Sequence, residues 1–148
     1  MQNLTDDQII AKALEILERR MLTTEHLTSP QATTSFLKLK LAGRDREAFC
    51  AVYLTAQHQV IAFEELSHGT LDAASVYPRV VIKAVLDQAA AAVIFAHNHP
   101  SGVAEPSIAD RRITERLVEA LALIEVRVLD HIIIGGANSY SFAEQGLL

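Results

Sequence analysis

A short, continuous apolar run that ends in a polar stretch constrains this chain more than any other feature of its sequence. Residues 90–97 read AAAVIFAH and are followed at once by NHPSGVAEP. An apolar run of this length is typical of a β-strand buried on both faces, which requires other elements above and below the sheet. The sequence therefore predicts an α/β protein whose polar chemistry lies where a central strand ends.

Four segments place apolar residues at helical spacing, at about residues 5–17, 32–43, 78–88 and 107–124. The first begins at Thr5, a predicted N-cap with Gln8 three residues later. Gly43 is a predicted C-terminal stop for the second helix, and Pro78 suits the first turn of the third.

Strand patterns alternate with these helices. EAFCAVYL and VIAFEEL read as two strands around the turn TAQHQ, and a further short strand is predicted near residues 70–76. The last predicted strand, VRVLDHIII, is closed by Gly135 and Gly136. The order of elements predicts an α/β sandwich: a mixed β-sheet flanked by helices.

Composition predicts one globular domain. The chain has 148 residues, of which 50% are hydrophobic and 21% are charged. We interpret residues 1–30 as an N-terminal helical extension and residues 31–148 as the domain. No apolar run reaches the roughly 18 to 20 residues of a membrane span, and the start MQNLTDDQII lacks the basic region of an export signal. We therefore expect a cytoplasmic protein with no membrane partner.

Charge and cysteine content narrow the function classes. The formal net charge of -5 argues against a general electrostatic grip on nucleic acid, although it leaves room for a local basic patch. The single cysteine, Cys50, cannot form an internal disulfide or supply a thiolate-rich metal site. Within AFCAVYL, Cys50 is predicted to be a small core residue.

Two histidines at the end of the central strand point to a metal site. Because side chains alternate along a strand, His97 and His99 project from the same face, whereas Asn98 points the other way. Asp110, eleven residues after His99, lies in the first turn of the next predicted helix and can supply a third ligand. Two histidines and one carboxylate with an open fourth position are typical of catalytic zinc.

Each of these residues also has a structural interpretation. A strand-end histidine is often simply hydrogen-bonded. Ser107 and Asp110 match a capping box, with Ser107 as N-cap and Asp110 at N3. Capping and metal binding do not exclude each other, so both interpretations stay open.

The same residues carry a family resemblance. His97, His99, Ser107 and Asp110 match the H-x-H-x7-S-x2-D motif of JAMM (MPN+) metalloproteases. Residues 32–148, including FAHNHPSG, VLDHIIIG and SYSFAEQG, resemble the RadC family, a bacterial branch of that superfamily. The resemblance implies a JAMM/MPN core, which is cytidine-deaminase-like, with Zn2+ bound by His97, His99 and Asp110. Longer RadC-like proteins carry a helix-hairpin-helix region that residues 1–30 do not resemble.

The resemblance also implies the remaining catalytic roles. In the JAMM pattern, a glutamate from an earlier strand takes a proton from the water on the metal and passes it to the leaving amine. Glu47 is our choice for this general base, with Glu64 and Glu65 as rivals. Ser107 is expected to donate a hydrogen bond to the oxyanion of the tetrahedral intermediate.

The other polar motifs receive no catalytic role. His131 is predicted to anchor the last strand or to support a metal ligand rather than bind metal. Surface positions are expected for the three histidines in polar stretches, which are His26, His58 and His68. Tyr77, Pro78 and Arg79 are interpreted only as a helix start.

Three classes of function are compatible with this sequence. A metallopeptidase or isopeptidase acting on a peptide or an isopeptide-linked protein is favoured, because the ligands, the serine and a candidate base are all present. A protein-binding module without activity and a RadC-like DNA-repair protein are the alternatives. Specificity is expected to come from loops 65–76 and 100–106, which do not identify the substrate.

Overall fold

The computed structural model of the chain describes residues 3–23, 30–69 and 76–148. Within these residues the helices are α1 (Asp6–Thr23), α2 (Pro30–Leu41), α3 (Pro78–Asp87) and α4 (Ile108–Ala122). The strands are β1 (Ala48–Leu54), β2 (Val60–His68), β3 (Ala92–Asn98), β4 (Arg127–Gly135) and β5 (Asn138–Ser141). No helix in these ranges combines the length and apolarity that crossing a membrane would require.

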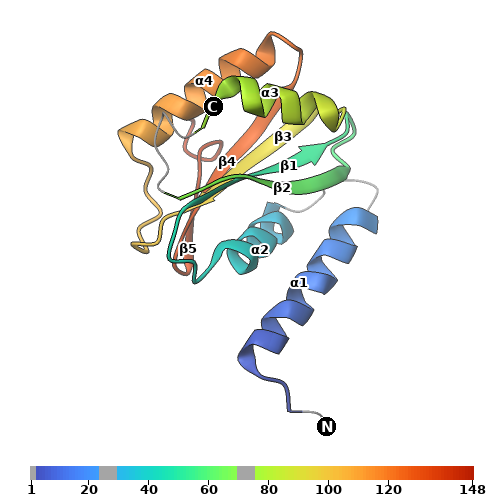
Figure 1. Cartoon of the computed structure of the whole chain (residues 1–148), viewed down its shortest axis with the longest axis vertical. Helices are drawn as coiled ribbons and strands as arrows, with labels where there is room; N and C mark the ends of the chain where they lie inside the picture. Colours follow the sequence, from blue (N-terminus) through green and yellow to red (C-terminus); the bar gives the residue numbers. More distant parts are fainter. Residues whose placement is uncertain (1–2, 24–29, 70–75) are drawn as a thin grey trace.

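The strands form one mixed sheet in the order β2-β1-β3-β4-β5. β1 pairs antiparallel with both β2 and β3, β3 pairs parallel with β4, and β4 pairs antiparallel with β5. Helices α3 and α4 cover one face of the sheet, and α1 and α2 lie on the other (Figure 1). The predicted mixed sheet flanked by helices is confirmed.

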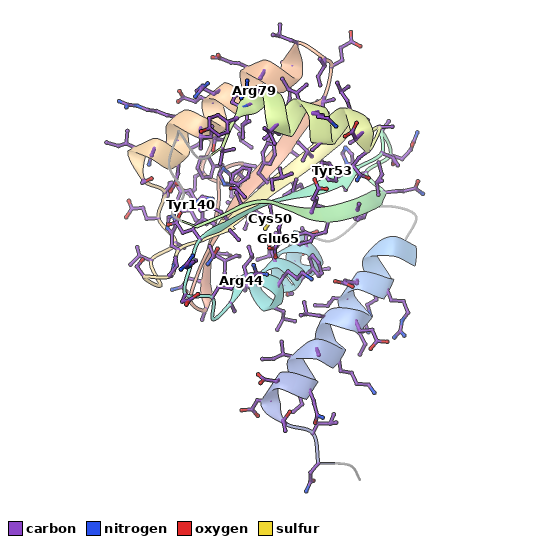
Figure 2. All side chains as sticks on the ribbon, viewed as in Figure 1. Arg44, Cys50, Tyr53, Glu65, Arg79 and Tyr140 are labelled. Atoms are coloured by element: carbon purple, nitrogen blue, oxygen red, sulfur yellow. The ribbon has the colours of Figure 1, made fainter. Side chains whose placement is uncertain are left out.

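Alternation along the strands divides the core into two clusters, one on each face of the sheet. Tyr53 of β1 faces α3, and Cys50 faces α2 (Figure 2). Cys50 is fully buried, as expected of a core residue, and burial raises the pKa of its thiol to about 12. Every residue of β3 is buried, because helices cover the strand on both faces.

Local signals explain where the helices begin. Thr5 and Gln8 form the predicted reciprocal cap: the Thr5 N–H donates to Gln8 Oε1 at 2.9 Å, and the Gln8 N–H donates to Thr5 Oγ1 at 3.2 Å. Pro78 is the first residue of α3, where its missing N–H costs nothing.

Helix α1 contacts the rest of the chain through only part of its apolar stripe. Leu14 and Leu17 pack against the core cluster on the α2 side. Ile9 and Ile10, further toward the N-terminus, are 52% and 42% exposed. The division of the chain at residue 30 stays a prediction.

The structure differs from the sequence prediction at the last strand. β5 was not predicted, because its four residues, NSYS, carry no apolar run. The segment forms a strand because it pairs with β4, and not because of a pattern in its own sequence. The strand expected near residues 70–76 falls, except for Val76, outside the described residues.

The packing of α4 generates a stability prediction. Leu117 is fully buried between α4 and the sheet, so Leu117→Ala should lower the free energy of unfolding by about 2–5 kcal/mol. Leu123, just past the helix, is 87% exposed, so Leu123→Ala should change the free energy of unfolding by less than about 0.5 kcal/mol. Urea denaturation of both variants measures the difference, and equal losses would contradict the assigned packing.

Candidate metal centre

Strand direction gathers the polar residues at one edge of the sheet. β3 and β4 are parallel, so their carboxyl ends meet there, and the antiparallel β1 brings its amino end to the same place. Phe49 pairs with His97. Continuing this antiparallel register by two residues on each strand places Glu47 opposite His99.

The two histidines differ in exposure. His97, still within β3, is completely buried, and its ring stacks on Phe49 with centroids 6.3 Å apart. His99 lies just beyond the strand, and its side chain is 13% exposed. The pair therefore reaches from the protein interior to the edge of solvent.

Asp110 enters from the first turn of α4. Ser107 and Asp110 form the predicted capping box: the Ser107 N–H donates to Asp110 Oδ2 at 2.8 Å, and the Asp110 N–H donates to Ser107 Oγ at 3.0 Å. This cap fixes the carboxylate at a buried position beside the histidines. Asp110 thus caps α4 and at the same time lies where it could serve as a metal ligand.

The donor atoms of these three residues converge. His97 Nε2 lies 3.0 Å from His99 Nε2 and 3.3 Å from Asp110 Oδ1, and His99 Nε2 lies 3.0 Å from Asp110 Oδ2. Ligands about 2.0–2.1 Å from a tetrahedral zinc would be about 3.3 Å apart. The spacing is that of a group able to hold one metal ion, and it is the one such group among the described residues.

A buried hydrogen-bond chain orients His97. Thr114 Oγ1 donates to the Asp110 carbonyl at 2.8 Å, so it must accept the 2.6 Å hydrogen bond from His131 Nδ1. Burial lowers the pKa of His131 well below its ordinary value, and the ring is neutral. His131 Nε2 then accepts from His97 Nδ1 at 2.7 Å, which leaves His97 Nε2 with a lone pair for a metal.

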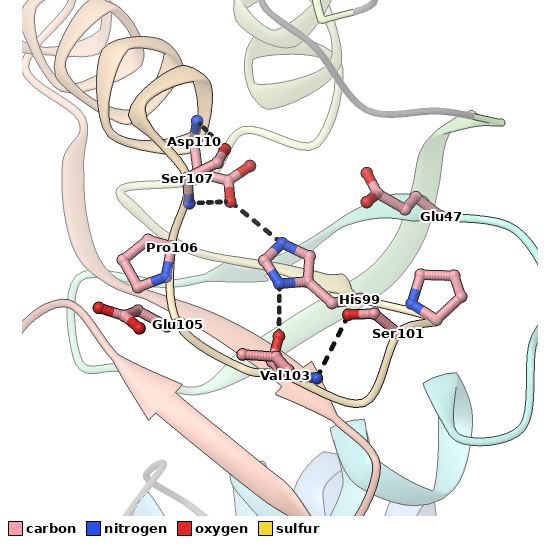
Figure 3. Close-up of a pocket in the computed structure, with 9 residues that line it drawn as sticks. Glu47, His99, Ser101, Val103, Glu105, Pro106, Ser107 and Asp110 are labelled. Atoms are coloured by element: carbon pink, nitrogen blue, oxygen red, sulfur yellow. Dashed lines mark hydrogen bonds and ion pairs between the residues drawn. The ribbon is translucent and has the colours of Figure 1, made fainter.

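His99 is oriented by a backbone carbonyl. Its Nδ1 donates to the oxygen of Val103 at 2.8 Å, so its Nε2 is the atom available to a metal (Figure 3). The Val103 loop rests directly on Gly135 at the end of β4. A Cβ at Gly135 would lie 2.5 Å from the Ala104 nitrogen, so this close approach requires glycine.

The donor set fits a cation. With both imidazoles neutral and oriented as described, two nitrogen lone pairs face each other across 3.0 Å beside a carboxylate. Such an arrangement is repulsive unless a proton or a cation lies between the atoms. The residues present therefore suit a positively charged metal ion.

The pKa values show how the cluster behaves when no metal is bound. The hydrogen bond to Asp110 raises the pKa of His99 above 6.5, against an opposing effect of desolvation. Burial by itself would raise the pKa of Asp110, but hydrogen bonds with His97 and His99 outweigh burial and hold it well below 3.8. The hydrogen bond between His99 and Asp110 thus favours the protonated form of His99, whose positive charge is the metal-free counterpart of a bound cation.

Beside the cluster lies an open cavity of about 480 Å³. Its lining consists of Glu47, His99, Pro100, Ser101, Val103, Glu105, Pro106, Ser107 and Asp110. Glu47 stands on one side of His99, with Glu105 and Pro106 on the other (Figure 3). Loop 100–106, one of the two predicted to determine specificity, forms much of this wall.

The rival glutamates are engaged elsewhere. Glu64 accepts a hydrogen bond from the Tyr53 hydroxyl at 2.8 Å, and Glu65 forms an ion pair with Arg44 on the α2 side of the sheet (Figure 2). Neither lines the cavity. Of the three glutamates considered, the structure brings only Glu47 to the metal cluster.

The remaining histidines have different positions. His131 contacts His97 and so has the second of the two roles predicted for it, that of supporting a neighbouring residue of the cluster. His58, predicted at the surface, is partly buried and has a positive φ of 63°. The predictions for His26 and for the side chain of His68 fall outside what the structure describes.

Thr114 is the site residue that sequence analysis missed. It lies four residues after Asp110, a spacing that brings it beneath that residue on the helix. A polar residue among the buried positions of α4 was the available signal. Its partner, His131, is 17 residues away in sequence, which no local pattern connects.

Comparison with known proteins identifies the family. The family described as the RadC-like JAB domain matches residues 27–147. The fold and the His-His-Asp cluster agree with a JAB domain, and the chain belongs to the RadC-like JAB family.

Relatives of two lengths are similar to this chain. A UPF0758 protein of Vibrio cholerae is 52% identical over 147 residues, which cover 99% of this chain and 92% of the relative. A UPF0758 protein of Vibrio parahaemolyticus is 56% identical over 137 residues, 90% of this chain and 61% of the relative. A third, from Stutzerimonas stutzeri, is 56% identical over 130 residues and is covered to 58% of its length.

The Thr114 hydroxyl generates a prediction about metal affinity. Thr114→Val removes the acceptor for His131 Nδ1, frees the His131 tautomer and should weaken metal binding about 10- to 100-fold. Thr114→Ser keeps the hydroxyl and should bind nearly as the unaltered chain does. Chelator competition with Zn2+ as the probe measures both, and equal affinities for Val and Ser variants would refute the orienting role.

The pair His99 and Asp110 generates a pH prediction for the metal-free chain. Because the pKa of His99 is higher in the folded state than in the unfolded state, its protonation stabilises the folded state. This stabilisation is complete below about pH 6.5 and is lost as pH rises through the folded-state pKa. Because the pKa of Asp110 is lower in the folded state, its ionised form stabilises the folded state above about pH 3.8. This stabilisation is lost as pH falls through the folded-state pKa of Asp110. Relative to Asp110→Asn, stability should therefore peak at mildly acidic pH.

Urea denaturation of both proteins in chelator, from about pH 4 to about pH 9, tests this dependence. Asp110→Asn retains a side-chain oxygen that can cap Ser107, so the variant isolates the charge. Parallel pH curves for the two proteins would contradict the coupling.

Proposed function

We propose that this protein is a zinc-dependent metallohydrolase that cleaves peptide or isopeptide bonds. The observation that carries the proposal is the convergence of three oriented donor atoms, from His97, His99 and Asp110, on one side of an open cavity that Glu47 also lines. A site with a role only in folding would be closed by four protein ligands.

The donor types favour zinc. Two imidazole nitrogens and one carboxylate oxygen form the ligand set of many catalytic zinc sites, whereas magnesium and calcium prefer oxygen ligands. When bound, the metal would lower the pKa of a water molecule toward neutrality and polarise the carbonyl of the scissile amide.

Glu47 is the proposed general base. Its carboxylate lies in the same cavity as His99, and its negative charge acts on that imidazole. One carboxylate oxygen accepts a proton from water and later delivers it to the nitrogen of the leaving amine, so that Glu47 ends the cycle ionised.

Ser107 is the proposed oxyanion donor. Its Oγ accepts the Asp110 N–H, a bond that uses an oxygen lone pair and not the hydroxyl hydrogen. The hydroxyl can therefore donate toward the cavity that Ser107 lines. In this way the residue caps α4 and can also stabilise negative charge on a substrate oxygen.

Replacing the base tests the proposal. Glu47→Gln should retain about one zinc per chain and lose on the order of 100- to 10,000-fold in kcat, because the amide cannot accept the proton. Glu105→Gln is the matched control, since Glu105 lines the same cavity across from Glu47 and should tolerate the change. The measurement is metal analysis combined with cleavage of peptide and isopeptide-linked libraries.

Two results would overturn the proposal. One is a purified protein that binds no zinc and cleaves no member of either library. The other is cleavage that continues unchanged in chelator or in the Glu47→Gln variant.

A further inference from the structure

The residue between the two histidines makes contacts that the site described above does not use. Asn98 is 3% exposed. Because side chains alternate along a strand, its side chain leaves β3 on the opposite side from that of His97. Its Oδ1 accepts the N–H of Ala48 at 2.8 Å, and its Nδ2 donates to the carbonyl of Arg46 at 3.0 Å. Both partners are backbone groups about 50 residues earlier in the chain.

These two backbone groups lie on either side of Glu47. The Arg46 carbonyl belongs to the peptide that enters Glu47, and the Ala48 N–H belongs to the peptide that leaves it. The amide of Asn98, with one acceptor and one donor, takes the position that a further peptide of β3 would occupy in an antiparallel ladder. It therefore fixes both peptide planes of Glu47 with one rigid side chain.

The other side of the same segment is held by the residue that follows β2. The Gly69 N–H donates to the Glu47 carbonyl at 2.8 Å, so the backbone of residues 46–48 is hydrogen-bonded on both flanks. Glu47 lines the cavity. Glu47 itself lies one residue before β1 begins, where the regular ladder has not yet started.

From this geometry we propose that Asn98 is a positioning residue for Glu47: it holds the backbone of the base in fixed register with the two metal ligands beside it. This inference rests on the proposed function, in which Glu47 is the base. The strand end HNH places two ligands on one side and an anchor for the base on the other. The distance between base and metal site is thus set by one tripeptide.

The proposal predicts a specific kinetic effect. Asn98→Ala should lower kcat about 10- to 100-fold, because a displacement of about 1 Å is sufficient to disrupt catalytic alignment. KM and the zinc content should change little, since the substrate cavity and the three metal ligands are untouched. Asn98→Ser, which keeps a small polar group in the buried site, is the second variant if Asn98→Ala folds poorly.

A double-mutant cycle separates positioning from general destabilisation. In the Glu47→Gln background, Asn98→Ala should lower the residual kcat by less than about twofold, because its effect acts through a carboxylate that is already absent. Val52→Ala, a cavity variant in the same strand away from residues 46–48, is the control and should leave kcat near that of the unaltered chain.

A measurement without substrate completes the test. The Ala48 amide should be protected from hydrogen exchange in the unaltered chain and exchange at least about 10-fold faster in Asn98→Ala, as followed by NMR. Unchanged Ala48 exchange, or kcat losses that multiply in the double variant, would overturn the role of Asn98 while leaving the proposed hydrolase intact. Rapid Ala48 exchange in a protein with no hydrolytic activity would instead count against the proposed function, and the catalytic role of Asn98 would fall with it.

Discussion

The position of β3 between an antiparallel and a parallel neighbour is the constraint on which the rest of the structure depends. Buried on both faces, this strand can carry polar groups only at its end. The parallel β4 places His131 beside Phe95, two residues before His97, and Glu47 lies just before the start of the antiparallel β1 at the same edge. Reversing β1 would carry Glu47 to the opposite edge, away from His97 and His99.

The hydrogen bonds around the cluster give its geometry a chemical meaning. Two neutral imidazoles have four ring nitrogens, and the bonds to His131 and to the Val103 carbonyl determine which two face inward. Because those partners are buried or held by the backbone, the lone pairs are oriented before any metal arrives. The site can therefore bind a cation without rearranging its ligands.

The start of α4 combines structural and chemical roles in two residues. Asp110 accepts the Ser107 N–H with the same carboxylate that meets the histidines, and a negative charge at a helix N-terminus is favourable in its own right. Helix formation thus helps to keep Asp110 ionised beside the two histidines. Ser107 and Asp110 cap the helix, and the same cap holds the Asp110 carboxylate beside the histidines.

Patterns within short segments determined much of this protein. Alternation put His97 and His99 on one face, and helical spacing and capping residues located the four helices found in residues 3–23, 30–69 and 76–148. Ser107 with Asp110 marked the helix that reaches the site. Only the tertiary structure decided which glutamate lines the cavity beside the histidines and that β5 forms on β4. It also decided that Thr114 and His131 orient His97 and that Asn98 holds the backbone on either side of Glu47. These features depend on pairing between segments far apart in the chain, because a strand register and a buried hydrogen bond exist only after both partners have been brought together.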